Sequence, residues 1–319
     1  MTLLTAETEK LLRCPRCRSG LSRQNAGFTC TNGECARRYP LTAQGIPILI
    51  DEDASVFSIA AFERQEPTFF HDLRGAARVL KKLVPEITNL RSKTNYETLR
   101  ARLLATSAAP RVLVLGGSIL GFGMEALDAA PIELVESDVA LGPRAKLICD
   151  AHSIPFADGS FDCVVAQAVL EHVVDPFRCV AENHRVLKPD GLDYAETPFM
   201  QQVHGGAYDF LRFSYLAYLR LFRNFEMLEC APVAGPAVAL AWSWEFFLLS
   251  FARSRRMRYL AKAFARFTAF PLKWFDYLLI DRPAAYDAAS GFFFLGRRNE
   301  KAVADRDLLN MYKGGGDSR

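Results

Sequence analysis

Four cysteines near the start of the chain have the spacing of a metal site. Cys14 and Cys17 form a CxxC pair, and Cys30 and Cys35 form a CxxxxC pair after a gap of twelve residues. Four thiolates at this spacing can reach one tetrahedral Zn²⁺ at about 2.3 Å, which leaves no position open for a substrate or a water. The pattern therefore predicts a structural zinc, which would stabilise a segment with too little core to fold unaided.

A glycine-rich loop in the middle of the chain has the composition of a nucleotide-binding turn. Residues 111–115 are a continuous apolar run, typical of a parallel strand that is buried on both faces. They are followed by the loop Gly116-Gly117-Ser118-Ile119-Leu120-Gly121. Residues 122–129 are expected to continue as a helix whose N-terminus faces a ligand. The first three residues of the loop are therefore candidate ligand contacts.

Acidic residues follow the loop at distances that suit a nucleoside. Glu136 and Asp138 lie 20 and 22 residues after Gly116, the distance expected of an acid that binds a ribose diol. Both are candidates, and Asp138 is preferred because the glycine loop is one or two residues longer than usual. Asp150 and Ala151 end a further apolar run, where a carboxylate and a backbone N–H could read the edge of an adenine.

Strands that alternate with helices are expected to position these residues. The segments with strand patterns are 111–115, 132–136, 146–149, 161–166, 192–196, 225–230 and 291–296. A helix is predicted over residues 175–187 and a turn over residues 188–191. This order predicts an α/β fold with a doubly wound, Rossmann-like sheet of seven strands.

The N-terminal cysteine segment resembles a known zinc ribbon. Residues 11–50 begin LLRCPRCRSGL and end CARRYPLTAQGIPILI, and they are similar to the ribbon of the small activator protein that partners tRNA and release-factor methyltransferases. In that family the ribbon binds and stabilises a protein partner. The resemblance therefore implies a methyltransferase fused to the ribbon, and a possible protein partner for the ribbon itself.

The middle of the chain resembles class I S-adenosylmethionine (SAM)-dependent methyltransferases of type 11. The resemblance covers residues 89–230 and a terminal strand, and it is most specific over residues 150–162 and over Leu170-Glu171-His172-Val173. It implies that SAM is the cofactor and that its contacts are Gly116 and Ser118 at the methionine end, Asp150 and Ala151 at the adenine, and Gln167 beside the sulfonium.

Two departures from the family pattern weaken the expected cofactor affinity. Val114 replaces an acid, and Ser118 replaces a glycine. One alternative is a methyltransferase-like scaffold that binds SAM without transferring the methyl group. Another is a nicotinamide dehydrogenase, which would not by itself predict the spacing of residues 150–156.

The residues after the fourth and fifth strands indicate the type of acceptor. The sequence Gln167-Ala168-Val169-Leu170 stands where amine methyltransferases carry Asn/Asp-Pro-Pro-Tyr/Phe, so an oxygen or carbon acceptor is favoured. His204 is the candidate general base, because a neutral imidazole can accept a proton near pH 7. The alternative is that His204 braces its loop. Asp209 and Arg212 are expected to pair structurally, whereas His71 and His184 have no context that indicates a role.

A predicted helical insertion over residues 232–288 has an unusual composition. Residues 246–275 contain seven basic residues, nine aromatic residues and no acid, in a chain whose net charge is only +3. Arginines beside aromatic faces suit the surface of an anionic bilayer, and this favours a lipid-linked acceptor over a glycan or another small molecule. The alternatives are ordinary packing with a solvated basic side, and RNA methylation, because arginines and aromatics also bind phosphates and bases.

Composition and segment order complete the expected organisation. The chain is 50% apolar, with 39 Lys and Arg against 36 Asp and Glu, which excludes a wholly disordered chain and gives no sign of a nucleic-acid coat protein. No signal-like segment or uncharged apolar run of membrane-spanning length is evident, so the protein is expected in the cytoplasm, peripherally at the inner membrane. The expected segments are a zinc ribbon (1–55), a helical connector (56–109) with helices at 75–83 and 96–104, a methyltransferase domain (110–300) and a C-terminal tail (301–319).

Overall fold

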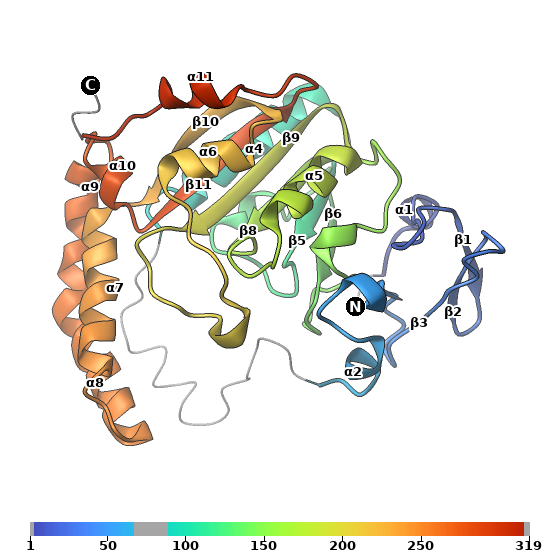
Figure 1. Cartoon of the computed structure of the whole chain (residues 1–319), viewed down its shortest axis with the longest axis horizontal. Coiled ribbons are helices and arrows are strands. Elements are labelled where there is room, and N and C mark those ends of the chain that lie inside the picture. Colours follow the sequence, from blue (N-terminus) through green and yellow to red (C-terminus); the bar gives the residue numbers. More distant parts are fainter. Residues whose placement is uncertain (1–2, 67–88, 316–319) are drawn as a thin grey trace.

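An eight-stranded mixed sheet lies at the centre of the computed structural model, which describes residues 3–66 and 89–315 (Figure 1). The strand order is β10-β11-β9-β8-β5-β6-β7-β4. The bounds are β4 Ile48–Leu49, β5 Arg111–Leu115, β6 Glu133–Asp138, β7 Leu147–Cys149, β8 Phe161–Gln167, β9 Leu187–Pro198, β10 Phe225–Ala234 and β11 Gly291–Arg298. Strand β11 runs antiparallel to both of its neighbours, and the pairs from β9 to β4 are parallel.

The prediction of a seven-stranded sheet is wrong by one strand, which the N-terminal segment supplies. Strand β4 pairs in parallel with β7, and the backbone N–H of Ile148 donates to the carbonyl oxygen of Pro47 over 2.9 Å. Both residues of β4 are fully buried. Without β4, strand β7 would be at the edge of the sheet with unpaired backbone groups. Strand β4 supplies the partners for these groups.

Two further local predictions differ from the structure. Residues 122–129 form no α-helix but one 3₁₀ turn, η2 (Met124–Ala126). Gly123 precedes this turn with a φ of +86°, a left-handed conformation that interrupts a right-handed helix. The predicted turn at residues 188–191 lies within strand β9, which is longer than its apolar part.

Helices cover both faces of the sheet. Alternate residues of β5 point to opposite sides: Leu113 belongs to the core that includes α5 (Pro176–Val186) and α6 (Tyr215–Leu221), and Val112 to the core that includes α4 (Ser92–Thr106). The predicted helix at 96–104 therefore lies within α4. The other predicted connector helix, 75–83, and His71 lie outside the described residues.

The N-terminal part is a small antiparallel sheet that docks against the main domain. It contains α1 (Ala6–Glu9), β1 (Leu21–Gln24), β2 (Gly27–Cys30) and β3 (Arg38–Pro40), followed by η1 (Glu52–Ala54) and α2 (Ile59–Glu63). Leu12 forms an antiparallel bridge with Phe156, and Arg18 donates to the Glu182 carboxylate of α5 over 2.8 Å. The N-terminal part and the main domain are therefore joined by backbone pairing as well as by side chains.

In the chain, a helical hairpin connects β10 to β11, and it lies at one side of the sheet (Figure 1). It consists of α7 (Pro236–Leu249) and α8 (Arg255–Ala269), followed by η5 (Phe270–Phe275), α9 (Asp276–Leu279) and α10 (Ala285–Ala288); α11 (Asp305–Leu309) follows β11. The buried Glu245 of α7 accepts from Arg266 of α8 over 2.8 Å. Buried Asp276 accepts from the backbone N–H groups of Gly235, Ala237 and Val238, which caps the start of α7. Along the described residues, no helix combines the length and the apolar character that crossing a bilayer requires.

A buried carboxylate in β9 makes the stability of the fold dependent on pH. Asp193 is fully buried, and neither of its oxygens has a hydrogen-bond partner among the described residues. Burial raises the pKa of Asp193 to about 7 from its ordinary 3.8, and the neighbouring Asn183 lowers it only in part. Between about pH 4 and 7 the folded chain holds a proton that the unfolded chain releases, so stability falls as pH rises.

We predict that Asp193→Asn stabilises the protein at pH 8 by on the order of 3 kcal/mol, because the amide needs no proton to be neutral. Urea unfolding at pH 5 and pH 8 measures the effect. The wild-type chain is expected to be less stable at pH 8 than at pH 5, and the variant to show a smaller difference. An equal pH dependence in both proteins would contradict the assignment.

Candidate functional site

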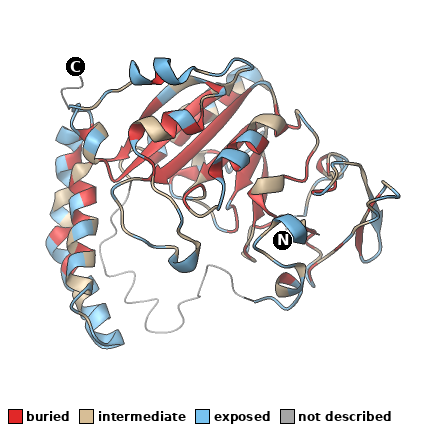
Figure 2. Cartoon of the chain, viewed as in Figure 1, coloured by how far each residue is buried: buried red, intermediate tan, exposed pale blue. Residues whose placement is uncertain are grey.

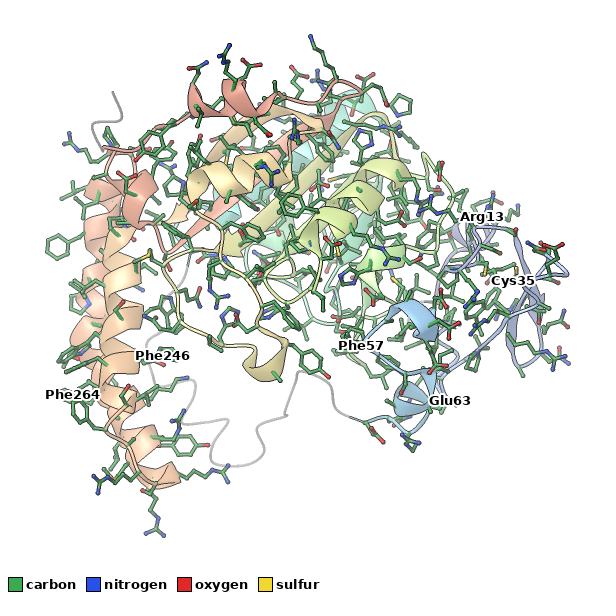
Figure 3. All side chains as sticks on the ribbon, in the orientation of Figure 1. Arg13, Cys35, Phe57, Glu63, Phe246 and Phe264 are labelled. Carbon is green, nitrogen blue, oxygen red and sulfur yellow. The ribbon has the colours of Figure 1, made fainter. Side chains whose placement is uncertain are left out.

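A cavity of about 810 Å³ lies at the carboxyl ends of the parallel strands. Residues that follow β5, β6, β7, β8 and β9 line it, as expected for an open α/β sheet. Val56 and Phe57 from the N-terminal part and Trp242 from α7 complete the wall. The Phe57 ring, labelled in Figure 3, stacks on Tyr208 with centroids 5.7 Å apart. The N-terminal segment and the loop after β9 therefore meet at this cavity.

The glycine loop contributes one of its three predicted contacts to the cavity wall. Gly116 lines the cavity with a φ of +69°, and a Cβ there would lie 2.7 Å from the Val169 side chain. Gly117 packs against Glu136 and does not line the cavity. Ser118 is fully buried, and its hydroxyl donates to the carbonyl oxygen of Ala140 over 2.5 Å. Gly117 and Ser118 therefore shape the loop from behind.

The two candidate ribose ligands have different surroundings. Asp138, at the end of β6, lines the cavity, and its carboxylate accepts from the backbone N–H of Ser118 over 2.9 Å. Glu136 does not line the cavity. Its carboxylate pairs with Arg144 and, over 2.8 Å, with Lys146. Asp138 is therefore the acid that a ligand in the cavity could reach.

Asp150 and Ala151 both line the cavity just after β7. The Asp150 carboxylate accepts from the backbone N–H of His152 over 2.9 Å and from the Ser55 hydroxyl of the N-terminal part. Burial raises the pKa of Asp150, but the hydrogen bonds from His152 and Ser55 lower it more, so the net pKa lies below its ordinary value. Asp150 is therefore ionised at neutral pH and held in place by two parts of the chain.

A hydrogen-bonded network connects the predicted Gln167 to a residue that sequence analysis missed. Gln167 lines the cavity at the end of β8, and its amide donates to the Glu196 carboxylate over 3.0 Å. Glu196 also lines the cavity and accepts from Ser92, Asn89 and Tyr194. Burial raises the pKa of Glu196, and these neutral donors offset part of the rise. An acid at the carboxyl end of a predicted parallel strand is the signal that could have identified Glu196.

The cavity wall carries acidic residues and histidines but neither Lys nor Arg among the described residues. Four acidic residues line the wall: Asp138, Asp150, Glu171 and Glu196. No Lys or Arg stands among the described residues that line it. Such a wall favours a ligand that carries positive charge, because the low dielectric of a cavity strengthens the attraction.

His204 lies beside Glu171 and His172, which belong to the segment 170–173 where the resemblance to methyltransferases is most specific. Its Nε2 is 3.1 Å from Nε2 of His172 and 3.6 Å from Oε1 of Glu171. Burial lowers the pKa of His204, but the Glu171 carboxylate raises it, and the net pKa lies above its ordinary value. All three residues line the cavity.

Asp209 and Arg212 pair as predicted and brace the loop that carries His204. Arg212 donates to the Asp209 carboxylate over 3.0 Å, and the same carboxylate accepts from the backbone N–H groups of His204 and Gly205. Burial raises the pKa of Asp209, but Arg212 and these N–H groups hold it well below its usual range. The position of His204 is therefore fixed by its own backbone.

The four N-terminal cysteines are gathered at one point. Their sulfur atoms all lie within 4.8 Å of one another, with Cys14 3.8 Å from Cys35 and Cys17 3.4 Å from Cys30. Thiolates that bind one Zn²⁺ at about 2.3 Å with tetrahedral angles lie about 3.8 Å apart. The donor set therefore fits a tetrahedral Zn²⁺. Figure 3 labels Cys35 within this N-terminal part.

Comparisons with known proteins relate the central part of the chain to methyltransferases. Residues 125–194 match the family model described as a methyltransferase domain. A ubiquinone/menaquinone biosynthesis C-methyltransferase of Cellvibrio japonicus is 29% identical over 123 residues, which cover 37% of this chain and 45% of that protein. An uncharacterized methyltransferase of Mycobacterium bovis is 36% identical over 111 residues, 32% of this chain and 45% of that protein.

Other matches are shorter or more distant. An uncharacterized 37.1 kDa protein in a Streptomyces fradiae transposon is 50% identical over 42 residues, which are 13% of this chain and 12% of that protein. The chain thus spans less than half the length of these curated relatives. Among solved structures, the [4+2]-cyclase SpnF has a TM-score of 0.39 at 18% identity over 74% of this chain and 87% of its own. Haemonchus contortus phosphoethanolamine N-methyltransferase 2 has a TM-score of 0.38 at 14% identity over 63% of this chain and 52% of its own.

Proposed function

We propose that this chain is a SAM-dependent methyltransferase that acts on an oxygen of an amphiphilic, lipid-linked acceptor. The observation that carries the proposal is the acidic cavity at the carboxyl ends of the strands, with four acidic residues and no Lys or Arg among its described lining. The cofactor carries a sulfonium and an ammonium group, which such a wall attracts. When bound, it supplies an electrophilic methyl group. The match of residues 125–194 to the methyltransferase domain supports the same activity.

The residues proposed to hold the cofactor are those of the predicted set that reach the cavity. Gly116 allows close approach to the backbone, Asp138 binds the ribose hydroxyls, and Asp150 with the N–H of Ala151 binds the adenine edge. Gln167 lies at the sulfonium end, where the network with Glu196 fixes its amide. We assign no direct contact with the cofactor to Glu136, Gly117 or Ser118, because these residues do not line the cavity.

We predict that Asp150→Ala weakens SAM binding by roughly 10- to 150-fold, the 1.5–3 kcal/mol of a charge-assisted hydrogen bond. Titration calorimetry measures the affinity. Asp158→Ala is the matched control, because the Asp158 carboxylate is 76% exposed and outside the cavity. Equal affinity of the two variants would mean that the adenine site has been misassigned.

The chemistry of the acceptor site favours an oxygen. His204 faces the cavity beside the buried Glu171, where its imidazole is the candidate group to take the proton of a hydroxyl. The segment after β8 lacks the Asn/Asp-Pro-Pro-Tyr/Phe sequence of amine methyltransferases. The cavity rim also exposes large apolar side chains, among them Ile119, Phe122 and Val174, each about half exposed. A polar head with an apolar tail suits these surroundings.

The outer surface of the hairpin supports presentation of the acceptor at a membrane. Seven of the nine aromatic side chains in residues 246–275 are exposed, namely Phe247, Phe251, Tyr259, Phe264, Phe267, Trp274 and Phe275. This finding disfavours the alternative that they pack in a core. On α8, Met257, Leu260, Phe264 and Phe267 recur every three or four residues and form one exposed apolar face. Figure 2 shows exposed residues along the length of the hairpin, and Figure 3 labels Phe264 among them.

Basic side chains at the tip of the hairpin favour an anionic surface. Arg253, just before α8, and Arg255, Arg256 and Arg258 in the first turn of α8 are all exposed. Each contributes about 1 kcal/mol to attraction near an anionic bilayer. We propose that the hairpin docks on such a bilayer and that Trp242 of α7, which lines the cavity, connects the docked surface to the acceptor site.

The activity itself is tested by incubating the purified chain with radiolabelled SAM and separate lipid, glycan and RNA extracts. Label in the lipid fraction is the expected result. Label in RNA would favour the second candidate, which rests on the same exposed arginines and aromatics. Cofactor binding without label in any fraction would indicate a non-catalytic scaffold.

A further inference from the structure

We propose that Glu171, His172 and His204 bind a divalent cation at the wall of the cavity. The three residues come from the loops after β8 and β9, and two backbone hydrogen bonds tie these loops together. The N–H groups of Phe210 and Leu211 both donate to the carbonyl oxygen of Glu171, over 2.8 and 3.2 Å. The cluster is far from the four N-terminal cysteines in sequence and has a different donor set, two imidazoles and one carboxylate.

The distances between the donor atoms suit a bound metal ion. The Nε2 atoms of the two histidines are 3.1 Å apart, and Oε1 of Glu171 lies 3.7 Å from His172 and 3.6 Å from His204. With metal–ligand bonds of about 2.1 Å, neighbouring ligands lie about 3.0 Å apart in octahedral and about 3.4 Å apart in tetrahedral geometry. Small adjustments of the side chains would therefore place all three atoms around one ion.

The hydrogen positions leave electron pairs directed into the cluster. Nδ1 of His172 lies 2.8 Å from the carbonyl oxygen of Tyr208, which can only accept, so this nitrogen carries the hydrogen. Nδ1 of His204 lies 3.5 Å from the Asp209 carboxylate and 3.4 Å from the carbonyl oxygen of Gln202, which favours a hydrogen there too. Both Nε2 atoms then present lone pairs to each other.

The Glu171 carboxylate provides the independent observation that points to a ligand. Its side chain is 0% exposed, and neither oxygen has a hydrogen-bond partner among the described residues. A buried carboxylate without a hydrogen bond is costly, whereas a cation at this point would satisfy it together with both imidazoles. The alternative to a cation is a proton shared between the Nε2 atoms of the two histidines.

The donor set selects the class of metal. Two imidazole nitrogens and one carboxylate oxygen suit Mn²⁺, Fe²⁺, Co²⁺ or Zn²⁺. Because all three residues line the cavity, the remaining coordination positions face the space where the acceptor would lie. Three protein ligands with open positions are typical of catalytic rather than structural sites.

The role of the cation, unlike its binding, rests on the proposed function. A hydroxyl oxygen of the acceptor would bind the ion, which lowers the pKa of that hydroxyl. The O–H bond breaks, the oxygen keeps the electron pair, and the proton passes to water. In this scheme His204 is a metal ligand. If methylation persists after the cation is removed, His204 acts instead as the general base.

The test is a titration of the full-length, zinc-loaded chain with Mn²⁺, followed by electron paramagnetic resonance. Mn²⁺ prefers nitrogen and oxygen to thiolate ligands, so it reports this cluster and not the cysteines. Before the titration, dialysis against a weak chelator empties the cluster. One Mn²⁺ per chain is expected to bind, and both Glu171→Gln and His204→Gln are expected to lose about 100-fold or more in affinity.

A matched histidine variant and the cofactor affinity serve as controls. His184→Gln, whose ring donates to the carbonyl oxygen of Asn299 away from the cavity, should bind Mn²⁺ as the wild type does. If Glu171→Gln fails to bind SAM, the loss of its buried carboxylate has disturbed the fold, and the Mn²⁺ affinity of His204→Gln is then the test. The His204 side chain is one-third exposed, so its replacement should leave the fold intact. The proposal is overturned if the wild type binds no Mn²⁺, Co²⁺ or Zn²⁺ beyond the cysteine site, or if His204→Gln binds as tightly as His184→Gln. A chain that binds the ion and SAM but methylates nothing would contradict the proposed function alone.

Discussion

Cys14→Ser or Cys30→Ser is expected to remove one zinc atom per chain and to unfold the N-terminal part of the protein. Both cysteines are buried, and the sulfur atoms of the cluster fit one tetrahedral ion. A structural zinc contributes an apparent 10–16 kcal/mol in isolated zinc-finger peptides, which is comparable with the whole stability of a typical domain, about 5–15 kcal/mol. Metal analysis of freshly prepared, reduced protein and thermal unfolding measure the two effects.

The loss is expected to extend to the cofactor site, because Ser55 of the N-terminal part donates to Asp150 and β4 pairs with β7. SAM affinity should therefore fall in both variants. Cys230→Ala is the control, since Cys230 is a buried cysteine of β10 outside the cluster. Wild-type protein that carries less than one zinc per chain, or serine variants that melt like Cys230→Ala, would exclude a structural zinc.

Reversing two charges at the tip of the hairpin, Arg256→Glu with Arg258→Glu, is expected to release the protein from anionic liposomes. Each arginine contributes about 1 kcal/mol and each glutamate opposes binding by a similar amount, so the loss is about 4 kcal/mol, roughly 1,000-fold in affinity. Flotation with vesicles of mixed anionic and zwitterionic lipids measures it. Lys301→Glu with Arg306→Glu changes the net charge equally at an exposed site after β11 and should leave binding intact.

RNA binding would weaken under the same substitutions, so the liposome assay needs a parallel RNA titration across salt. Counterion release predicts a steep loss of RNA affinity as salt rises. If wild-type protein ignores anionic liposomes but binds RNA with that salt dependence, the lipid proposal fails and the RNA proposal replaces it. SAM affinity should stay unchanged in both double variants, because none of the four substituted residues lines the cavity.

The elements that sequence analysis predicted best are those whose signal is local. Strand β5 matches its predicted bounds, 111–115, because four of its five residues are buried and the glycine loop ends it. The helix predicted at 122–129 failed because Gly123 has a left-handed conformation that outweighs the helical pattern of its neighbours. Strand β4 could not be predicted as part of the main sheet, since its partner lies about one hundred residues away in the chain.

The difference between local and long-range signals also explains which residues of the candidate site were predicted. Asp138 and Asp150 stand at strand ends, where a sequence pattern places them next to a ligand, and both line the cavity. The association of His204 with Glu171 and His172 depends on how two long loops fold against each other, and no periodicity relates positions 32 or 33 residues apart. Glu196 was treated as part of a strand only, because most of its partners are distant in the chain: Asn89 and Ser92 lie about one hundred residues before it, and Gln167 lies in β8.

The position of β4 at the edge of the sheet has a consequence for folding during synthesis. The N-terminal part leaves the ribosome first, but β4 has no partner until β7 has been made, about one hundred residues later. At roughly 5–20 residues per second this interval is on the order of 5–20 seconds. During that time an apolar strand of the nascent chain, with Ile48 and Leu49, stays unpaired, and the cysteines are free to bind their metal before the central sheet exists. If the cysteines bind the expected zinc, the ion can therefore be loaded before β4 pairs with β7.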